Sequence, residues 1–174
     1  MEQQDKRRVA VFCAYAVALH GVERLIPSPV PWLRFGFANI ITIVIIVIYG
    51  LRSGLILTII RVTVGSILFG TFLGPAYVLS LAGGVFSTMV MGTVHKILPT
   101  TFSPFGLSLF GAITHSGVQV IIAYFLFINS FYAIAVITPV IMLFSTLTGA
   151  LNGVASVFLL KQLQNSSTFV QNTV

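Results

Sequence analysis

The stretch ERLIPSPVPWLRFGFAN, residues Glu23–Asn39, separates two long apolar runs and decides how the rest of the chain is interpreted. It contains three charged residues, three of the seven prolines and the only tryptophan. Pro27, Pro29 and Pro31 exclude a helix in this stretch and favour a stiff, extended connector. Because polar side chains gather here beside apolar segments, the stretch predicts the mouth of a binding site.

The composition indicates a protein whose solvent is lipid. Of the 174 residues, 57% are hydrophobic and 7% are charged, whereas about a quarter of a soluble domain is usually charged. The net charge of +6 does not indicate nucleic-acid binding, because the basic residues are scattered at segment ends. The single cysteine, Cys13, excludes an internal disulfide and a cysteine-rich metal site.

The apolar runs predict an all-α integral membrane protein with six transmembrane helices, since a spanning helix needs about 20 apolar residues. The expected spans are 9–26, 33–50, 54–74, 77–95, 105–128 and 132–160. The first run follows three basic residues but lacks a cleavage site, so we expect it to be retained. Pro139 predicts a kink or a late start in the last span. Residues 1–161 would form the membrane domain and residues 162–174 a polar, disordered tail.

The distribution of basic residues predicts the orientation. Six of them fall on the cytoplasmic side if the N-terminus is inside: Lys6, Arg7, Arg8, Arg52, Lys96 and Lys161. Only Arg24 and Arg34 then fall outside, so we expect both termini in the cytoplasm and the Glu23–Asn39 connector on the outer face. Arg61 falls within the third span, where it either lines a cavity or extends its guanidinium to the cytoplasmic head groups.

Small or polar residues recur on one face of several predicted helices. In the first helix Ala10, Ala14 and Ala18 form a ridge that suits either packing inside the bundle or docking of a partner. Three later segments carry polar stripes: Ser80, Gly84, Ser87 and Met91; Ser108, Gly111, His115 and Gln119; Ser145, Thr148, Asn152 and Ser156. These stripes either bond to one another between helices or line a pocket open to one side.

The residue sets of several enzyme classes are absent from the sequence. Three acidic residues cannot form the two aspartate-rich motifs with which isoprenyl diphosphate synthases hold magnesium, and the chain has no Walker phosphate loop. It also lacks a motif for covalent flavin attachment. His20, His95 and His115 lie on separate segments, so we do not expect a shared metal site. We therefore expect no enzymatic activity, no metal and no covalently bound cofactor.

Three runs resemble a bacterial membrane family called the Gx transporter family, or heptaprenyl diphosphate synthase component I. The runs are ERLIPSPVPWLRFGFANI, RVTVGSILFGTFLGPAYVLSLAGGVFSTMVMG and FGLSLFGAITHSGVQ, and the resemblance covers roughly Leu19 to Gln119. The family in turn resembles the S components of energy-coupling-factor vitamin transporters, which are six-helix proteins with an outward-facing pocket. Small residues on their first helix dock an energy-coupling membrane subunit. Family members often have lysine at the position of Arg34 and asparagine at that of Ser116.

The resemblance implies a non-enzymatic subunit of the bacterial cytoplasmic membrane that binds a small, anionic organic molecule of vitamin, flavin or isoprenoid type. The candidate ligand-binding residues are Glu23, Arg24, Arg34, Asn39, Arg61, Ser80, His115, Gln119 and Asn152, and the candidate docking residues are Ala10, Ala14 and Ala18. Arg24 and Arg34 would hold the anionic group near the outer face, with Glu23 orienting one of them. Asn39, His115 and Gln119 would bond the ligand more deeply.

Two sets of partners follow from the resemblance. In a transporter of the S-component type, the partners would be an energy-coupling membrane protein and its ATPases. In the alternative, the chain would be a membrane subunit of a flavin-based electron-transfer complex, with flavin or quinone brought by a flavoprotein partner and the quinone pool. A membrane helper of prenyl diphosphate synthesis is a third, weaker alternative.

Overall fold

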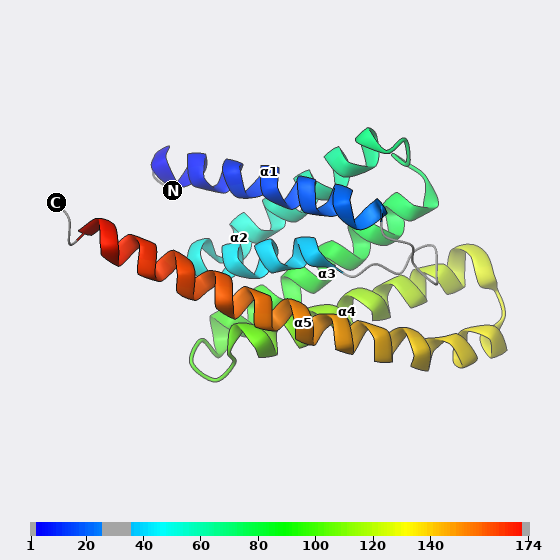
Figure 1. The fold of residues 1–174 in the computed structure, drawn as a ribbon. Coiled ribbons are helices and arrows are strands. Elements are labelled where there is room, and N and C mark those ends of the chain that lie inside the picture. The colour runs from blue at the N-terminus through cyan, green and yellow to red at the C-terminus, as the bar shows by residue number, and fades with distance from the viewer. Residues whose placement is uncertain (1–2, 26–35, 172–174) are drawn as a thin grey trace.

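The computed structural model describes residues 3–25 and 36–171, and within them every regular element is helical. The elements are α1 (Gln3–Leu25), α2 (Phe37–Leu68), α3 (Pro75–Ile97), α4 (Pro104–Ala123), the π-helical turn η1 (Tyr124–Ile128) and α5 (Phe131–Gln171). Figure 1 shows these long helices side by side in one bundle, with the start of α1 and the end of α5 at the same end. The prediction of an all-α protein is confirmed.

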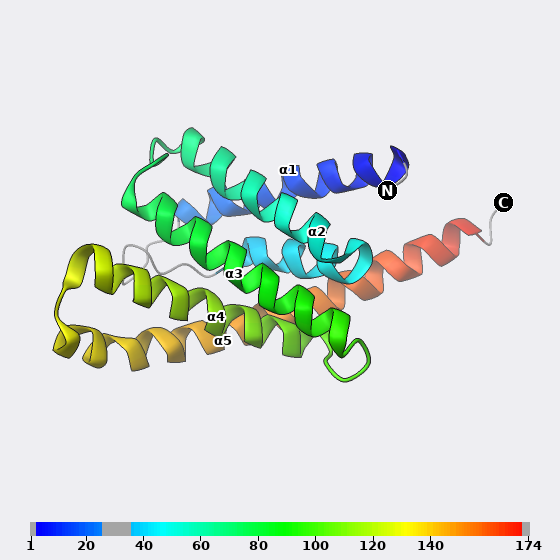
Figure 2. The same cartoon turned by 180° about the vertical axis from the view of Figure 1, so that it is seen from behind.

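The predicted count of six separate helices is not supported, because the described residues form five α-helices, one of which consists of two helical limbs joined across a kink. The second and third expected spans, 33–50 and 54–74, belong to one element, α2, whose two limbs run in different directions on either side of Gly50 (Figures 1 and 2). Gly50 has φ 80° and ψ 177°, a conformation that only a residue without a Cβ adopts readily. One such residue replaces the connecting loop that the sequence predicted at 50–54. The cytoplasmic location of the termini stays a prediction.

Four helical stretches are long and apolar enough to cross a membrane, namely Phe37–Leu68, Pro75–Ile97, Pro104–Ile128 and Phe131–Asn165. Within the described residues α1 does not reach this standard, because Arg8 precedes its apolar stretch and Glu23 and Arg24 end it. The expected first span, 9–26, is therefore less apolar than the others. The chain is a multi-pass membrane protein.

The helices pack mainly on their neighbours in sequence, and α5 returns to contact α2. The first limb of α2 is the most buried segment, since Ile43, Val44, Ile45 and Ile46 are almost fully enclosed. Large apolar side chains on the other helices point away from the bundle, among them Phe86 on α3. This arrangement places an apolar belt where lipid would lie and leaves the bundle interior for the polar stripes.

Gly83 and Gly84 let α3 approach two helices closely. A Cβ on Gly83 would lie 3.0 Å from the carbonyl oxygen of His115 on α4, and one on Gly84 would lie 2.9 Å from the Thr58 side chain on α2. The double glycine therefore brings His115 and the α2 residues near Thr58 to the two sides of α3.

The last helix is longer than predicted. Residues 162–171, expected to be a disordered tail, continue α5 as far as Gln171, and Pro139 lies inside the helix. Leucine, lysine and glutamine favour helix, and the sequence LLKQLQ at residues 159–164 extends it beyond the expected span.

Candidate functional site

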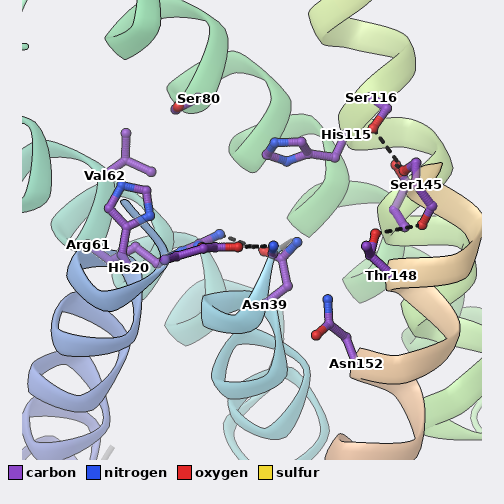
Figure 3. A pocket seen from close by; sticks show the side chains of 13 residues that line it. His20, Asn39, Arg61, Val62, Ser80, His115, Ser116, Ser145, Thr148 and Asn152 are labelled. Atoms are coloured by element: carbon purple, nitrogen blue, oxygen red, sulfur yellow. Dashed lines mark hydrogen bonds between the residues drawn. The ribbon is translucent and has the colours of Figure 1, made fainter. Parts of the chain in front are cut away.

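A polar cavity of about 40 Å³ lies between the helices, with room for about three water molecules (Figure 3). Its walls come from all five α-helices and from Gly36 just before α2. The lining residues are His20, Glu23, Gly36, Asn39, Arg61, Val62, Ser80, Ala112, His115, Ser116, Ser145, Thr148 and Asn152. Ten of these thirteen residues have polar side chains, so this is a small polar site inside an apolar bundle.

Arg61 is the positively charged group of this cavity. Its side chain is 4% exposed, and its Nη2 donates a hydrogen bond of 2.6 Å to Oδ1 of Asn39. Its Nε is buried and has no hydrogen-bond partner among residues 3–25 and 36–171. Of the two interpretations that the sequence left open for Arg61, the structure supports the cavity-lining one. A guanidinium buried with an unused donor is costly unless a ligand or water accepts its proton.

Two more open donors lie on the same side of the cavity. The Asn39 oxygen accepts from Arg61, while its amide nitrogen has no side-chain hydrogen bond within the described part of the chain. The hydroxyl of Ser80 on α3 lines the cavity, is 7% exposed, and is likewise without a partner among those residues. We call Arg61, Asn39 and Ser80 the donor wall.

The opposite side of the cavity is bonded internally. Ser116 on α4 donates to the Ser145 hydroxyl on α5 at 2.8 Å, and Ser145 donates to the carbonyl oxygen of Ala112 at 2.7 Å (Figure 3). Thr148 donates to the carbonyl oxygen of Ser145 at 3.1 Å. We call Ser116, Ser145 and Thr148 the bonded wall. The Ser116 and Ser145 hydroxyls hold α4 and α5 together, in line with one interpretation of the polar stripes, whereas the Thr148 bond lies within α5.

Glu23 connects α1 to the start of α2. Its Oε1 accepts hydrogen bonds from the backbone N–H groups of Gly36 and Phe37, where the helix dipole favours a negative charge. The carboxylate also attracts the Arg61 guanidinium. One negative and one positive group therefore share the cavity.

Six of the nine candidate ligand-binding residues line the cavity: Glu23, Asn39, Arg61, Ser80, His115 and Asn152. Gln119 is buried but lies outside the lining, and its side chain fits against Gly83. Arg34 and the side chain of Arg24 lie outside the described residues. The structure therefore brings most of the predicted set together around Arg61.

His20 belongs to the lining, although the sequence gave no reason to include it. Its ring fits beside Gly65 on α2, where an added Cβ would lie 2.6 Å from Cδ2 of the imidazole. The available signal was its spacing from Glu23, because residues three apart share one face of a helix. Ser145 and Thr148 of the bonded wall were recognised on a stripe that either bonds between helices or lines a pocket, whereas Ser116 was on no predicted stripe.

The sequence matches the family model of heptaprenyl diphosphate synthase component I over residues 12–159. The chain belongs to this family. The match confirms the resemblance and extends it beyond Leu19–Gln119 into most of α1 and α5. Neither the curated proteins nor the solved structures provide a match to the chain.

The small-residue ridge of this family member points away from its bundle. Ala10, Ala14 and Ala18 are exposed, whereas Val9, Cys13 and Ala16 of the same helix are buried. Among the described helices, α1 contacts α2 alone. The ridge is therefore not packed inside this chain, and docking stays an expectation for the function proposed below.

The described residues contain no group of three or more histidine, cysteine, aspartate or glutamate side chains that could hold a metal ion. His20 and His115 both line the cavity, and in Figure 3 they project from opposite sides of it.

Proposed function

We propose that this member of the heptaprenyl diphosphate synthase component I family is a non-enzymatic membrane subunit that binds a small, anionic organic molecule in the cavity. The observation that carries the proposal is the buried Arg61 with an unused Nε donor, beside the open donors of Asn39 and Ser80. Unpaired buried donors cost free energy. A ligand with acceptor oxygens recovers that cost.

The proposed role is transport, in the manner of the S components that the family resembles. The exposed ridge Ala10, Ala14 and Ala18 supports docking of an energy-coupling membrane protein with its ATPases, since small residues admit close approach of a second helix. The same helix carries His20 and Glu23 to the cavity near its last turns. With the termini in the cytoplasm of a bacterium, this end of α1 lies toward the outer face, so the ligand enters from outside.

The test begins with what the protein retains when it is purified from its native membrane in a mild detergent. Small molecules extracted from wild type, Arg61→Met and Arg52→Met are compared by mass spectrometry. Arg52 is the matched control, because it is an exposed arginine of the same helix outside the cavity. We expect one compound in wild type and Arg52→Met that is lost from Arg61→Met, since methionine replaces the unbranched stem of arginine but donates no hydrogen bond.

Equal amounts of every extracted compound in all three proteins would contradict the proposal. Proteins recovered in the same preparation separate the roles. A coupling protein with ATPases supports transport, whereas a flavoprotein supports the electron-transfer alternative.

A further inference from the structure

The donor wall has the hydrogen-bonding pattern of a receptor for one small group of acceptor atoms. Arg61 Nε, the Asn39 amide nitrogen and the Ser80 hydroxyl belong to the two limbs of α2 and to α3, and all three residues line the same cavity. An ionised carboxylate only accepts hydrogen bonds, through two oxygens with about four lone-pair sites. A guanidinium is planar and suits the planar carboxylate.

The charged groups among the described lining residues favour a ligand with a single negative charge. Arg61 supplies one positive charge, and the Glu23 carboxylate on the same cavity already attracts it. No lysine or second arginine is present among the described lining residues. A phosphate group carries a charge of about −1.5 to −2 near pH 7, and a diphosphate carries more. The described lining residues compensate a single negative charge better than several.

The volume of the cavity also favours a carboxylate over a diphosphate. About 40 Å³ accommodates roughly three water molecules. A carboxylate has three non-hydrogen atoms, whereas a diphosphate has three times as many. The size of a carboxylate therefore matches this volume more closely than that of a diphosphate.

We infer that the cavity recognises a single carboxylate and excludes a diphosphate. This inference rests on the proposed function and narrows its ligand class. It also separates the ligand of this chain from the diphosphate that appears in the family description. Arg61 makes the charged contact, and Asn39 and Ser80 donate to the same pair of carboxylate oxygens.

The test compares two probes that both carry C–H protons, acetate and methylenediphosphonate, by saturation-transfer difference NMR on the full-length protein in detergent. The solution is kept at pH 8, above the ordinary histidine pKa of about 6.5. We expect the acetate protons to receive saturation from wild type and from Arg52→Met. The affinity of Arg61→Met for acetate should be about tenfold lower, as for one lost charge-assisted hydrogen bond. Methylenediphosphonate should give no signal that depends on Arg61.

An Arg61-dependent methylenediphosphonate signal would overturn the inference, and so would acetate binding that is absent from wild type or unchanged in Arg61→Met. If Arg61→Met does not fold, Ser80→Ala serves the same comparison, with a severalfold weaker acetate affinity expected. The two proposals fail differently. An Arg61-dependent compound that lacks a carboxylate removes the inference alone, whereas the absence of any such compound removes the proposed function with it.

Discussion

The donor wall and the bonded wall face the same cavity and use their polar groups differently. On the bonded wall, Ser116 donates a hydrogen bond to Ser145, and Ser145 donates one to a backbone carbonyl of α4. On the donor wall, Arg61 Nε and the Ser80 hydroxyl have no partner in the described residues. Serine occurs on both walls, so the residue type alone does not distinguish a side chain that joins two helices from one that is available to a ligand. The two kinds of serine differ in whether the hydroxyl has a hydrogen-bond partner within the described residues.

The energetic consequence is a division of roles. Interhelical hydrogen bonds in membranes contribute modestly, about 0.6 kcal/mol on average, and two of them on the bonded wall fix α4 against α5. Unpaired donors contribute nothing to folding and cost free energy when buried. We therefore expect substitutions on the bonded side to change stability and substitutions on the donor wall to change ligand affinity.

The largest expected effect comes from added volume between α4 and α5. A Cβ on Gly153 would lie 3.0 Å from Cα and 3.2 Å from the carbonyl oxygen of Phe105, and backbone cannot move aside as a side chain can. We expect Gly153→Ala to lower the free energy of unfolding by about 1–3 kcal/mol, the usual cost of overpacking. Reversible unfolding in mixed micelles provides the measurement.

Gly117→Ala is the matched control for this prediction. It adds the same methyl group to a helix of the same pair, but its nearest neighbour is the flexible end of Met142 at 3.7 Å. We expect its stability to stay near that of wild type. Equal losses in the two variants would show that the α4–α5 contact is not specifically close-packed at Gly153.

A smaller effect is expected on the donor wall. Ser80→Ala removes a hydroxyl that has no hydrogen-bond partner in the described structure, so the unfolding free energy should stay within about 0.5 kcal/mol of wild type. Affinity for the ligand should fall by about 0.5–1.5 kcal/mol, the contribution of one neutral hydrogen bond. Calorimetric titration measures the affinity. A loss of stability in Ser80→Ala without a loss of ligand affinity would show that Ser80 stabilises the fold and does not bind the ligand.

A further small effect is expected from Ser108→Ala, which tests a hydrogen bond between helices away from the cavity. Ser108 on α4 donates a 2.7 Å hydrogen bond to the carbonyl oxygen of Gly149 on α5 and lies outside the cavity lining. Its loss should cost about 0.6 kcal/mol of stability and leave ligand affinity unchanged. Ser156→Ala, which removes a bond within α5 alone, should cost less. A reversed order would refute the view that the interhelical bonds stabilise the bundle.

The fold class and many of the lining residues could be predicted from the sequence, because apolar length and helical spacing determine them. His115 and Asn152 were found in this way, since each lies on a polar stripe. The reversal at Gly50 was not predicted in its observed form. A single backbone conformation replaces a loop there, and Gly-rich sequence suggests a break without giving its length.

The partners of the polar groups could not be predicted, because they depend on how the helices pack. Glu23 accepts hydrogen bonds from the backbone at the start of α2, a contact that its position in the sequence did not indicate. The arginine side chains that it was expected to orient lie outside the described residues. His20 reaches the cavity because α1 fits against Gly65, a contact between segments far apart in sequence. The ridge of Ala10, Ala14 and Ala18 was recognised from spacing, while its exposure required the structure.

The account depends most on the unused donor of Arg61, and one measurement addresses that atom directly. Protein labelled with ¹⁵N at arginine Nε gives one N–H signal per arginine, and the signal of Arg61 is the one missing from Arg61→Met. We predict that addition of acetate shifts this signal in wild type, with the Arg52 signal unchanged, because a carboxylate oxygen accepts the Nε proton. An Arg61 signal that stays in place while acetate or the co-purified compound binds would contradict the account.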